Sequence, residues 1–384
     1  MSERLAFIQA CLHRAERIVE ICDRFGISEK TGHKWLRRFQ LGGVDALADR
    51  SHARRDQPHR MATEIAAQIL KWRRRTGYGA GKLRDLLMQR QPQVRWPSAS
   101  CIGQLLQRAQ LIRPRRRRSH DAERRALDGR RTPAVAPNDV WTADFKGEFR
   151  LTNRLECYPL TVLDLHSHYL LGCRALTTTA VAPTRRAFQR LFREYGLPGV
   201  VRTDNGVPFA QHNALGRLGA LAFWWVRLGI RPEHITPARP AENGAHERFH
   251  KTLKAATIRP PAASLGAQQR RFDRFRQEYN STRPHESVPG HLPPGRGYTP
   301  APRPYPERLP TISYPATAEV RLVDRGGWIK WRAQPLFLST NLSGQYVGLT
   351  ETDRELITIA YASLALGDFD PHLQRFIPRV RWLD

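Results

Sequence analysis

Three acidic residues stand where an α/β domain could build a reactive site. Asp144 lies in an alternating apolar and polar stretch, Asp204 follows a short apolar run, and Glu247 precedes several basic residues. Ligands of open α/β sheets bind at strand ends, so the first two positions suit a shared site. Three carboxylates directed at one point repel each other unless a cation neutralises them, and oxygen ligands suit Mg²⁺ or Mn²⁺. Two such ions would clamp an in-line displacement at phosphorus, which predicts cleavage or joining of DNA phosphodiester bonds.

The stretch that begins at Glu247 has the spacing of one helix face. At i, i+3, i+4 and i+7 this face carries a carboxylate and three groups suited to phosphate, namely Glu247, His250, Lys251 and Lys254. Phe249 and Leu253 face the other way, toward a core. We therefore predict that His250, Lys251 and Lys254 bind DNA. The alternatives are a solvated helix face for the two lysines and simple packing for His250.

The elements that must position these acids follow an α/β order. Strand-like alternation and helical spacing succeed each other after Val140, with strands expected at 140–146, 158–165, 169–176 and 199–203 and helices at 180–195, 214–228, from 243, and 267–280. A sheet layered with helices is the architecture that this order indicates. Asp164 lies at a turn between two expected strands, where a turn role competes with a metal role.

Two helical modules are expected before this domain. Residues 5–39 carry apolar residues at three- and four-residue spacing, broken by Gly26-Ile27-Ser28, which indicates a helix-turn-helix with Ser28 as the cap of its second helix. The outward face of that helix carries side chains suited to the major groove, namely Lys30, Thr31, His33, Lys34 and Arg37. Residues 62–112 repeat the pattern, with Pro97-Ser98 opening the last helix. An ordinary helical hairpin and a plain three-helix bundle are the alternatives.

The charge of the chain indicates a polyanionic partner. The net charge is +28, and residues 1–137 hold +17 of it. Double-stranded DNA is the partner that such an excess favours. A run of arginines is expected to form a flexible arm that also grips phosphates, namely Arg115, Arg116, Arg117 and Arg118.

Composition excludes several other classes of protein. A hydrophobic content of 40% is too high for a wholly disordered chain. The longest apolar stretch, near 218–226, is about half of the roughly 18 residues that a membrane span needs. The first residues open no signal-peptide pattern, and the five cysteines form no Cys-x-x-Cys, so neither a disulfide framework nor a zinc knuckle is indicated. We expect a cytoplasmic protein with no membrane partner.

Composition also changes twice toward the end of the chain. Residues 289–310 contain eight Pro and three Gly, which is typical of a linker, and 317–384 alternates like a small β domain with Gly326-Gly327 as a hairpin turn. The expected fold is therefore multidomain, with helical modules, an α/β core and a small all-β domain. Its boundaries are expected at 1–55, 56–112, 113–137 for an Arg-rich linker, 138–288 for the core, 289–311 for the Pro-rich linker, and 312–384.

These motifs, taken together and in order, resemble a known family. Trp141-x-x-Asp144-Phe145, Asp204-Asn205-Gly206 and the segment 240–254, with Pro240, Gly244, Glu247, Leu253 and Lys254 in place, resemble the catalytic core of retroviral-integrase type. Tyr279-Asn280-x-x-Arg283-Pro284-His285 resembles the continuation of that core in bacterial insertion-sequence transposases. The resemblance extends along nearly the whole chain.

The resemblance implies an RNase H-like fold in which Asp144, Asp204 and Glu247 form a D-D-E triad that holds two Mg²⁺ or Mn²⁺ ions. It implies a transposase that binds terminal inverted repeats, hydrolyses the strand at the 3′ end of the element, and joins the freed 3′-hydroxyl to target DNA by transesterification. It also implies contacts of Lys251 and Lys254 with the DNA end. Because two ends must be held together, a dimer or larger complex on DNA is expected.

One spacing departs from the family pattern. The family is often described by 35 residues between the second acid and the glutamate, whereas 42 separate Asp204 from Glu247. Glu242 would give 37, but the flanking motif residues favour Glu247, and an inserted segment near Trp224-Trp225 would account for the difference. Two other functions remain open at this point: a non-catalytic helix-turn-helix regulator, and a metal-dependent nuclease of the same fold without strand transfer.

Overall fold

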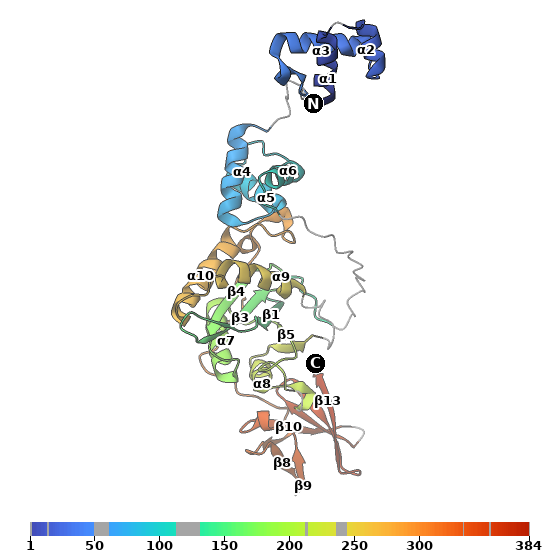
Figure 1. Ribbon diagram of the computed structural model, residues 1–384. Helices are drawn as coiled ribbons and strands as arrows, with labels where there is room; N and C mark the ends of the chain where they lie inside the picture. The colour runs from blue at the N-terminus through green and yellow to red at the C-terminus, as the bar shows by residue number, and fades with distance from the viewer. Residues whose placement is uncertain are drawn as a thin grey trace. The chain divides into compact units, whose positions relative to one another are not determined.

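The computed structural model describes residues 2–13, 15–49, 61–112, 131–211, 214–235, 244–332, 334–352 and 355–383. They belong to two compact units, Met1–Thr63 and Glu64–Asp384, which are described separately (Figure 1). None of the described helices is both long and apolar enough to span a bilayer.

The first unit is a small helical domain. Its elements are α1 (Ser2–Leu12), α2 (Ile18–Arg24), α3 (Glu29–Gly42) and the short η1 (Val44–Leu47). Gly26 takes a positive φ of 61° in the turn, and the Ser28 hydroxyl accepts a hydrogen bond from the Thr31 N–H, which caps α3 as the sequence predicts. The helices enclose a core built on Phe7, Ile8, Ile21, Cys22 and Leu47. The expected helix-turn-helix is thus confirmed.

The second unit begins with another three-helix module. This module, named module 2 below, comprises α4 (Thr63–Thr76), α5 (Ala80–Arg90) and α6 (Ala99–Arg108). The Ser98 hydroxyl accepts from the Cys101 N–H and caps α6, as the Pro97-Ser98 signal predicts. Leu83, Leu86, Ile102 and Leu106 are buried between the helices.

A mixed sheet follows, and it carries the candidate site. Its strands are β1 (Val140–Phe145), β2 (Phe149–Arg150), β3 (Glu156–Asp164), β4 (Leu170–Leu176), β5 (Val200–Thr203) and β6 (Arg231–His234). Their order is β2-β3-β1-β5-β6, with β4 also paired to β3. The β3 pairings are antiparallel, whereas β1, β5 and β6 run parallel to one another.

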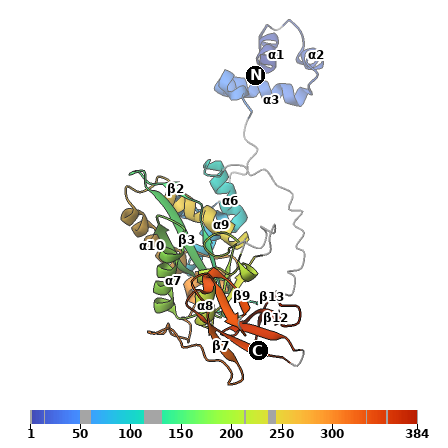
Figure 2. The same cartoon turned by 90° about the horizontal axis from the view of Figure 1, so that it is seen from below.

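Helices cover both faces of this sheet. On one face α7 (Val181–Tyr195) and α8 (Ala220–Arg227) enclose Trp141 and Ala143 of β1 in an aromatic core. On the other face α9 (Gly244–Leu253) and α10 (Leu265–Ser281) pack on β3 and β4 (Figure 2). The expected α/β layers are therefore confirmed, and Trp141, Trp224 and Trp225 are core residues. The short η2 (Leu215–Arg217) precedes α8.

The helix expected to carry Lys254 is shorter than the sequence indicates. The α-helix α9 ends at Leu253, and Lys254–Ile258 form one turn of π-helix, η4. Its Thr257 hydroxyl donates to the Leu253 carbonyl, and Thr257 and Ile258 are buried. Burial of these two side chains therefore accompanies the changed winding.

The Pro-rich segment 289–311 connects core and β domain but is not an extended linker. It contains η5 (Pro289–His291) and η6 (Pro294–Arg296), and its backbone is tied to the core where the Ala301 N–H donates to the Tyr195 carbonyl. Tyr298 stacks on Tyr169 with ring centroids 4.2 Å apart. Aromatic side chains among the prolines thus fix the segment on the core.

The chain ends in a β domain, as predicted. Its strands are β7 (Glu319–Leu322), β8 (Trp328–Trp331), β9 (Gln334–Phe337), β10 (Tyr346–Glu351), β11 (Ile357–Tyr361), β12 (Leu364–Asp370) and β13 (Arg375–Trp382), and the short η7 (Thr340–Leu342) follows β9. Five of these strands form a sheet in the order β13-β12-β11-β10-β7, and β8 and β9 form a separate hairpin. Gly326-Gly327 turns between β7 and β8, but these strands pair with β10 and β9 and not with each other, so the predicted hairpin is wrong. Phe223 of α8 packs on Tyr361 of this domain.

Candidate active site

Two of the three predicted acids lie at the ends of neighbouring parallel strands. The register pairs Ala143 of β1 with Thr203, the last residue of β5. Asp144, the penultimate residue of β1, and Asp204, the first residue after β5, therefore follow the same residue pair. Adjacent strands run about 4.8 Å apart. Side chains alternate between the two faces of a strand, and Ala143 is in the core below α7. Asp144 therefore lies on the opposite face, which α9 covers.

The turn after β5 holds Asp204 in place. One carboxylate oxygen, Oδ1, accepts a hydrogen bond from the Gly206 N–H at 3.1 Å. The Asn205 side-chain amide donates to the Ile235 carbonyl at 2.8 Å, which ties the turn to the chain after β6. A Cβ on Gly206 would lie 3.1 Å from Oδ2 of Asp204, so glycine leaves this carboxylate its space. The Asp-Asn-Gly motif thus builds a rigid turn around one acid.

Two histidines of α9 fasten that helix to the sheet beside Asp144. His246 Nε2 lies 2.7 Å from Thr142 Oγ1, and His250 Nε2 lies 2.9 Å from Thr161 Oγ1. Thr161 is the cross-strand partner of Asp144, and its hydroxyl donates to the Asp144 carbonyl at 3.0 Å. Because that hydroxyl proton is used, His250 Nε2 must donate to Thr161.

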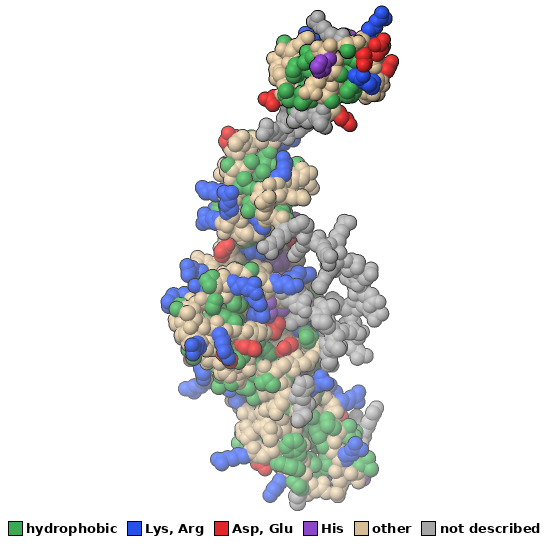
Figure 3. Space-filling model, viewed as in Figure 1, with side chains coloured by type: hydrophobic (Ala, Val, Ile, Leu, Met, Phe, Trp, Pro, Cys, Tyr) green, Lys and Arg blue, Asp and Glu red, His purple; other side chains and the backbone are tan. Residues whose placement is uncertain are grey.

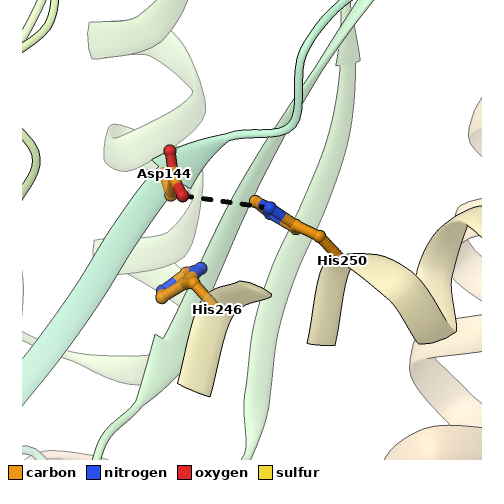
Figure 4. A group of neighbouring side chains, drawn as sticks. All are labelled: Asp144, His246 and His250. Atoms are coloured by element: carbon orange, nitrogen blue, oxygen red, sulfur yellow. Dashed lines mark ion pairs between the residues drawn. The ribbon is translucent and has the colours of Figure 1, made fainter. Parts of the chain in front are cut away.

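The opposite nitrogen of His250 faces Asp144. Its Nδ1 lies 3.9 Å from Asp144 Oδ2 (Figure 4). Burial lowers the pKa of His250 to about 3 and that of His246 to about 4, so both rings are neutral at pH 7. A neutral ring that donates from Nε2 carries a lone pair on Nδ1. Nδ1 of His250 and the Asp144 carboxylate are thus two acceptors directed at a common space.

The described residues contain a group of side chains with the donors and spacing for a metal ion. One donor atom from each of Asp144, His246 and His250 lies within 4.8 Å of the others. His246 Nδ1 is buried and has no hydrogen-bond partner among the described residues. Asp204 is not part of this group, although its strand adjoins that of Asp144.

The other predicted site residues fall into three groups. Glu247 belongs to α9, between His246 and His250, but its carboxylate lies outside the described part of the structure, as do Glu242 and Arg115, Arg116, Arg117 and Arg118. Lys251 and Lys254 are exposed. In the first unit Lys30, His33, Lys34 and Arg37 are exposed on α3, whereas Thr31 is half-buried and belongs to the cap.

His250 does not share the exposed face of the two lysines. His250 is only 8% exposed, and its ring lies beside Asp144 and Thr161 on the sheet. The expectation that His250 stands on a DNA-facing surface is therefore corrected. Packing, the alternative weighed for this residue, describes its position, because the ring fills the gap between α9 and the sheet.

Sequence reasoning missed His246, Thr142 and Thr161. A signal for the first was present, since His246 and His250 are four residues apart and so share a helix face. The two threonines could be found only with the strand register. Asp164, in contrast, has the predicted turn role: it is fully buried and accepts hydrogen bonds from Asn138 N–H and from Ser167.

The motif at 279–285 also has a structural role. The Asn280 side chain accepts from the Leu170 N–H and donates to the Leu170 carbonyl, both at 2.9 Å, which fixes α10 on β4. His285 stacks on His168 with centroids 4.4 Å apart, and the Arg283 guanidinium lies 4.7 Å from the ring centroid of Tyr78 in module 2. This motif therefore joins sheet, α10 and module 2.

Comparison with known proteins agrees with this architecture. Residues 134–240 and 228–294 match two family models that are both described as integrase core domains. Residues 3–56 match a helix-turn-helix domain, and 31–106 match a homeodomain-like domain. The chain thus carries an integrase core domain preceded by helix-turn-helix domains.

Three similar proteins illustrate the relationship. The chain is 27% identical over 269 residues to the insertion element IS407 uncharacterized 31.7 kDa protein of Burkholderia multivorans, an alignment that covers 68% of this chain and 90% of that protein. It is 27% identical over 130 residues to the Pol polyprotein of feline endogenous virus ECE1, covering 34% of this chain and 12% of the polyprotein. The HTLV-2 integrase catalytic core domain, solved in complex with magnesium, aligns at 15% identity with a TM-score of 0.34, over 43% of this chain and 98% of that chain.

Proposed function

We propose that the protein is the transposase of an insertion sequence. In this proposal it binds the terminal inverted repeats of its element, hydrolyses the strand at each 3′ end, and joins the freed 3′-hydroxyl to target DNA. The observation that carries the proposal is that Asp144 and Asp204 directly follow a residue pair of two adjacent parallel strands, β1 and β5, and that the helix bearing Glu247 contacts the sheet beside Asp144. The integrase core domain and the insertion-element relative support it.

The donor set near Asp144 fits a divalent cation. Asp144, Asp204 and Glu247 offer carboxylate oxygens, which suit Mg²⁺ or Mn²⁺, and the unprotonated Nδ1 of His250 is an additional donor that Mn²⁺ accepts more readily than Mg²⁺ does. His246 Nδ1 is a second ring nitrogen of this group, and it is buried without a hydrogen-bond partner among the described residues. A pair of divalent ions, when bound, supplies positive charge that stabilises the attacking and leaving oxygens of an in-line displacement.

The chain's own residues would divide the remaining work. The three carboxylates would hold the ions, and the two histidine–threonine contacts fix α9, which bears Glu247, against the sheet. Lys251 and Lys254, both exposed, bind phosphates of the DNA end. The freed 3′-hydroxyl attacks the target phosphodiester directly and the leaving 3′-oxygen takes up the proton, so no covalent protein intermediate is required.

DNA recognition is assigned to the helical modules. The exposed Lys30, His33, Lys34 and Arg37 on α3 would read one groove, with Thr31 at the start of the helix. Basic side chains are spread widely over the face of the molecule shown in Figure 3, and together with Arg115, Arg116, Arg117 and Arg118 they would supply salt-sensitive phosphate contacts. Because both element ends must be held at once, we propose a dimer or larger assembly on nucleoid DNA in the bacterial cytoplasm.

The test is a cleavage assay on a labelled duplex that carries the element end and its flank. Wild-type protein with Mg²⁺ or Mn²⁺ is expected to nick at the 3′ end. Asp144→Asn, Asp204→Asn and Glu247→Gln are each expected to lower nicking by at least about 100-fold while DNA binding is retained. Glu148→Gln, which removes an exposed carboxylate four residues after Asp144, is the matched control and should keep full activity.

Three outcomes would change the proposal. Loss of nicking in Glu242→Gln but not in Glu247→Gln would move the third acid. Binding by folded wild-type protein without cleavage would favour a regulator. Nicking without any joined product would favour a nuclease of the same fold.

A further inference from the structure

A cavity of about 960 Å³ lies between module 2 and the helix that carries Glu247. One wall is the turn Thr76–Lys82, between α4 and α5. The facing wall is formed by Lys251 and Thr252 of α9, by the π-helical turn, and by Arg283 and Glu286 after α10. This cleft, named the junction cleft below, is separate from the group formed by Asp144, His246 and His250.

Specific contacts fix the two walls of the junction cleft. The Tyr78 hydroxyl lies 3.4 Å from Glu278 of α10, and the Arg283 guanidinium lies over the Tyr78 ring. Asp85 of α5 pairs with His291 at 3.0 Å. Module 2 is therefore held on the core by side chains from both sides, and the cleft is a built feature of the second unit.

The charge of the junction cleft is strongly positive. Among the described residues, its lining carries four cations, Arg73, Lys82, Lys251 and Arg283, against the single carboxylate of Glu286. Arg73 is committed to the protein, since its guanidinium donates to the carbonyls of Gly77, Tyr78 and Leu111. Burial lowers the pKa of the Lys82 ammonium, and the nearby Arg283 lowers it further.

The turn also offers backbone donors. The first N–H groups of α5 have no partners within the helix, and its N-cap, Gly79, has no side chain that could cap them. Gly79 and Gly81 need no special φ, and a Cβ at either would meet nothing within 4 Å. Neither backbone strain nor packing inside the chain explains these two glycines, whereas the close approach of an outside group would.

We propose that the junction cleft binds the sugar–phosphate backbone of the element-end DNA, with Lys82, the start of α5 and Lys251 on the same strand. Phosphate groups accept hydrogen bonds from the free N–H groups at a helix N-terminus and bind nearby ammonium groups. Lys251 is one helical turn from Glu247, so a strand gripped here is led to the helix that bears the third acid. This inference rests on the proposed function for the identity of the DNA, and it assigns module 2 a second task, the positioning of the strand that reacts.

The test compares two substitutions that break the same ion pair. Lys82 Nζ lies 3.8 Å from Glu286 Oε1, so Lys82→Gln and Glu286→Gln disturb the junction alike but change the charge of the cleft in opposite directions. Binding of the full chain to an element-end duplex is measured by fluorescence anisotropy across a salt series, in EDTA. Lys82→Gln is expected to weaken binding about 10-fold and to lower the slope of log K against log salt by about 1. Glu286→Gln is expected to leave binding unchanged or to tighten it.

Lys71→Gln is the matched control, since Lys71 is exposed on α4 and does not line the cleft. Equal losses in Lys71→Gln and Lys82→Gln would show diffuse attraction and overturn the proposal. Equal losses in Lys82→Gln and Glu286→Gln would show a structural role of the pair and overturn it as well. Because this readout needs no cleavage, a loss of binding in Lys82→Gln but not in Glu286→Gln would support the cleft even if the wild type failed to nick DNA.

Discussion

The two helical modules of this chain come from nearly the same sequence pattern and yet differ in their dependence on the rest of the molecule. In each, three short helices succeed one another and a serine caps the third, Ser28 in one and Ser98 in the other. The first module encloses its own core and forms a compact unit alone. Module 2 belongs to the same compact unit as the integrase core and is tied to it through Tyr78, Asp85 and the segment after α10.

This difference shows that the local sequence pattern predicts where the helices form, but not whether a module packs on the rest of the chain. The residues that attach module 2 lie about 200 positions away, for example Glu278 opposite Tyr78 and His291 opposite Asp85. Because these contacts join module 2 to α10, DNA bound by module 2 would be held in register with the sheet that carries Asp144. The first module encloses its core without such contacts, and sequence recognition by this module remains our proposal. The following predictions test this contrast.

The largest effect is expected from emptying the core of the first module. Phe7 is fully buried and makes edge contacts with Phe25 and Trp35. Phe7→Ala should cost about 3–5 kcal/mol, enough to unfold a domain of this size. Calorimetry should then show loss of one transition, while the transition of Glu64–Asp384 stays in place. A matching downward shift of the second transition would contradict the independence of the two units.

A second prediction concerns acid at the junction of module 2 and the core. Burial and the neighbouring His168 lower the pKa of His285 to about 3. In the unfolded chain this histidine therefore takes up a proton near the ordinary pKa of about 6.5, whereas in the folded chain it stays neutral. The free energy of unfolding therefore decreases as pH falls from about 6.5 toward 3. The loss should approach about 1.4 kcal/mol per pH unit in the second unit.

Denaturant titrations of wild type and His285→Gln between pH 7 and pH 4 check the pH effect. The variant is expected to lose less stability over this range than the wild type does. Identical slopes of unfolding free energy against pH would show that His285 is not the titrating group.

A third prediction uses one chemical change at two glycines. A Cβ on Gly32 of α3 would lie 2.5 Å from Cys22 Sγ and 2.9 Å from Phe7 Cζ, so Gly32→Ala should destabilise the first unit by about 1–3 kcal/mol. Gly103 lies inside α6 with its nearest neighbour, Ala80 Cβ, at 3.9 Å, so Gly103→Ala should stabilise module 2 by about 0.5–1 kcal/mol. Thermal unfolding of both variants measures the two signs. Stabilisation by Gly32→Ala would contradict the close packing of α3 on Cys22 and Phe7, and destabilisation by Gly103→Ala would contradict the free space at α6.

The smallest effect is expected at the contact of Arg283 with Tyr78. Arg283→Lys keeps the charge but loses the planar group that lies over the ring, which should cost about 0.5–1 kcal/mol. Hydrogen exchange should accelerate in α4–α6 and not in α1–α3. Uniform acceleration along the chain would mean that the contact does not hold module 2 in particular.

Much of this fold is predictable from sequence because its signals are local. Helical spacing and capping serines give both modules, and alternation gives β1, β3 and β4 to within a few residues. Alternation over 317–384 predicts the C-terminal β domain as a whole, but it does not predict the shift in the register of β12 and β13 between Ala365 and Gly367. The packing of 289–311 was missed because proline content indicates an extended chain, whereas Tyr298 and Tyr305 decide the outcome by contacts with distant residues.

The candidate site also has features that the sequence predicts and features that it does not. The sequence predicts that Asp144 lies within one strand and that Asp204 directly follows another, and the register shows that these two strands are adjacent and parallel. The contacts of His246 and His250 depend on how α9 seats on the sheet, which requires the register of β1 with β3. Helical periodicity predicts that His250 shares a face with the two lysines. A side chain at the edge of that face can point to solvent or to the sheet, and the hydrogen bond with Thr161 directs His250 to the sheet.

The central claim is that the site at Asp144 joins DNA strands. The most direct measurement supplies a pre-nicked element end, whose 3′-hydroxyl is already free, together with a labelled target duplex, so that joining is observed without prior hydrolysis. Wild-type protein with Mg²⁺ or Mn²⁺ should give joined products, and Asp144→Asn should give none while binding both DNAs as the wild type does. Joined products from Asp144→Asn, or no joining by folded wild-type protein on the right end, would contradict the account.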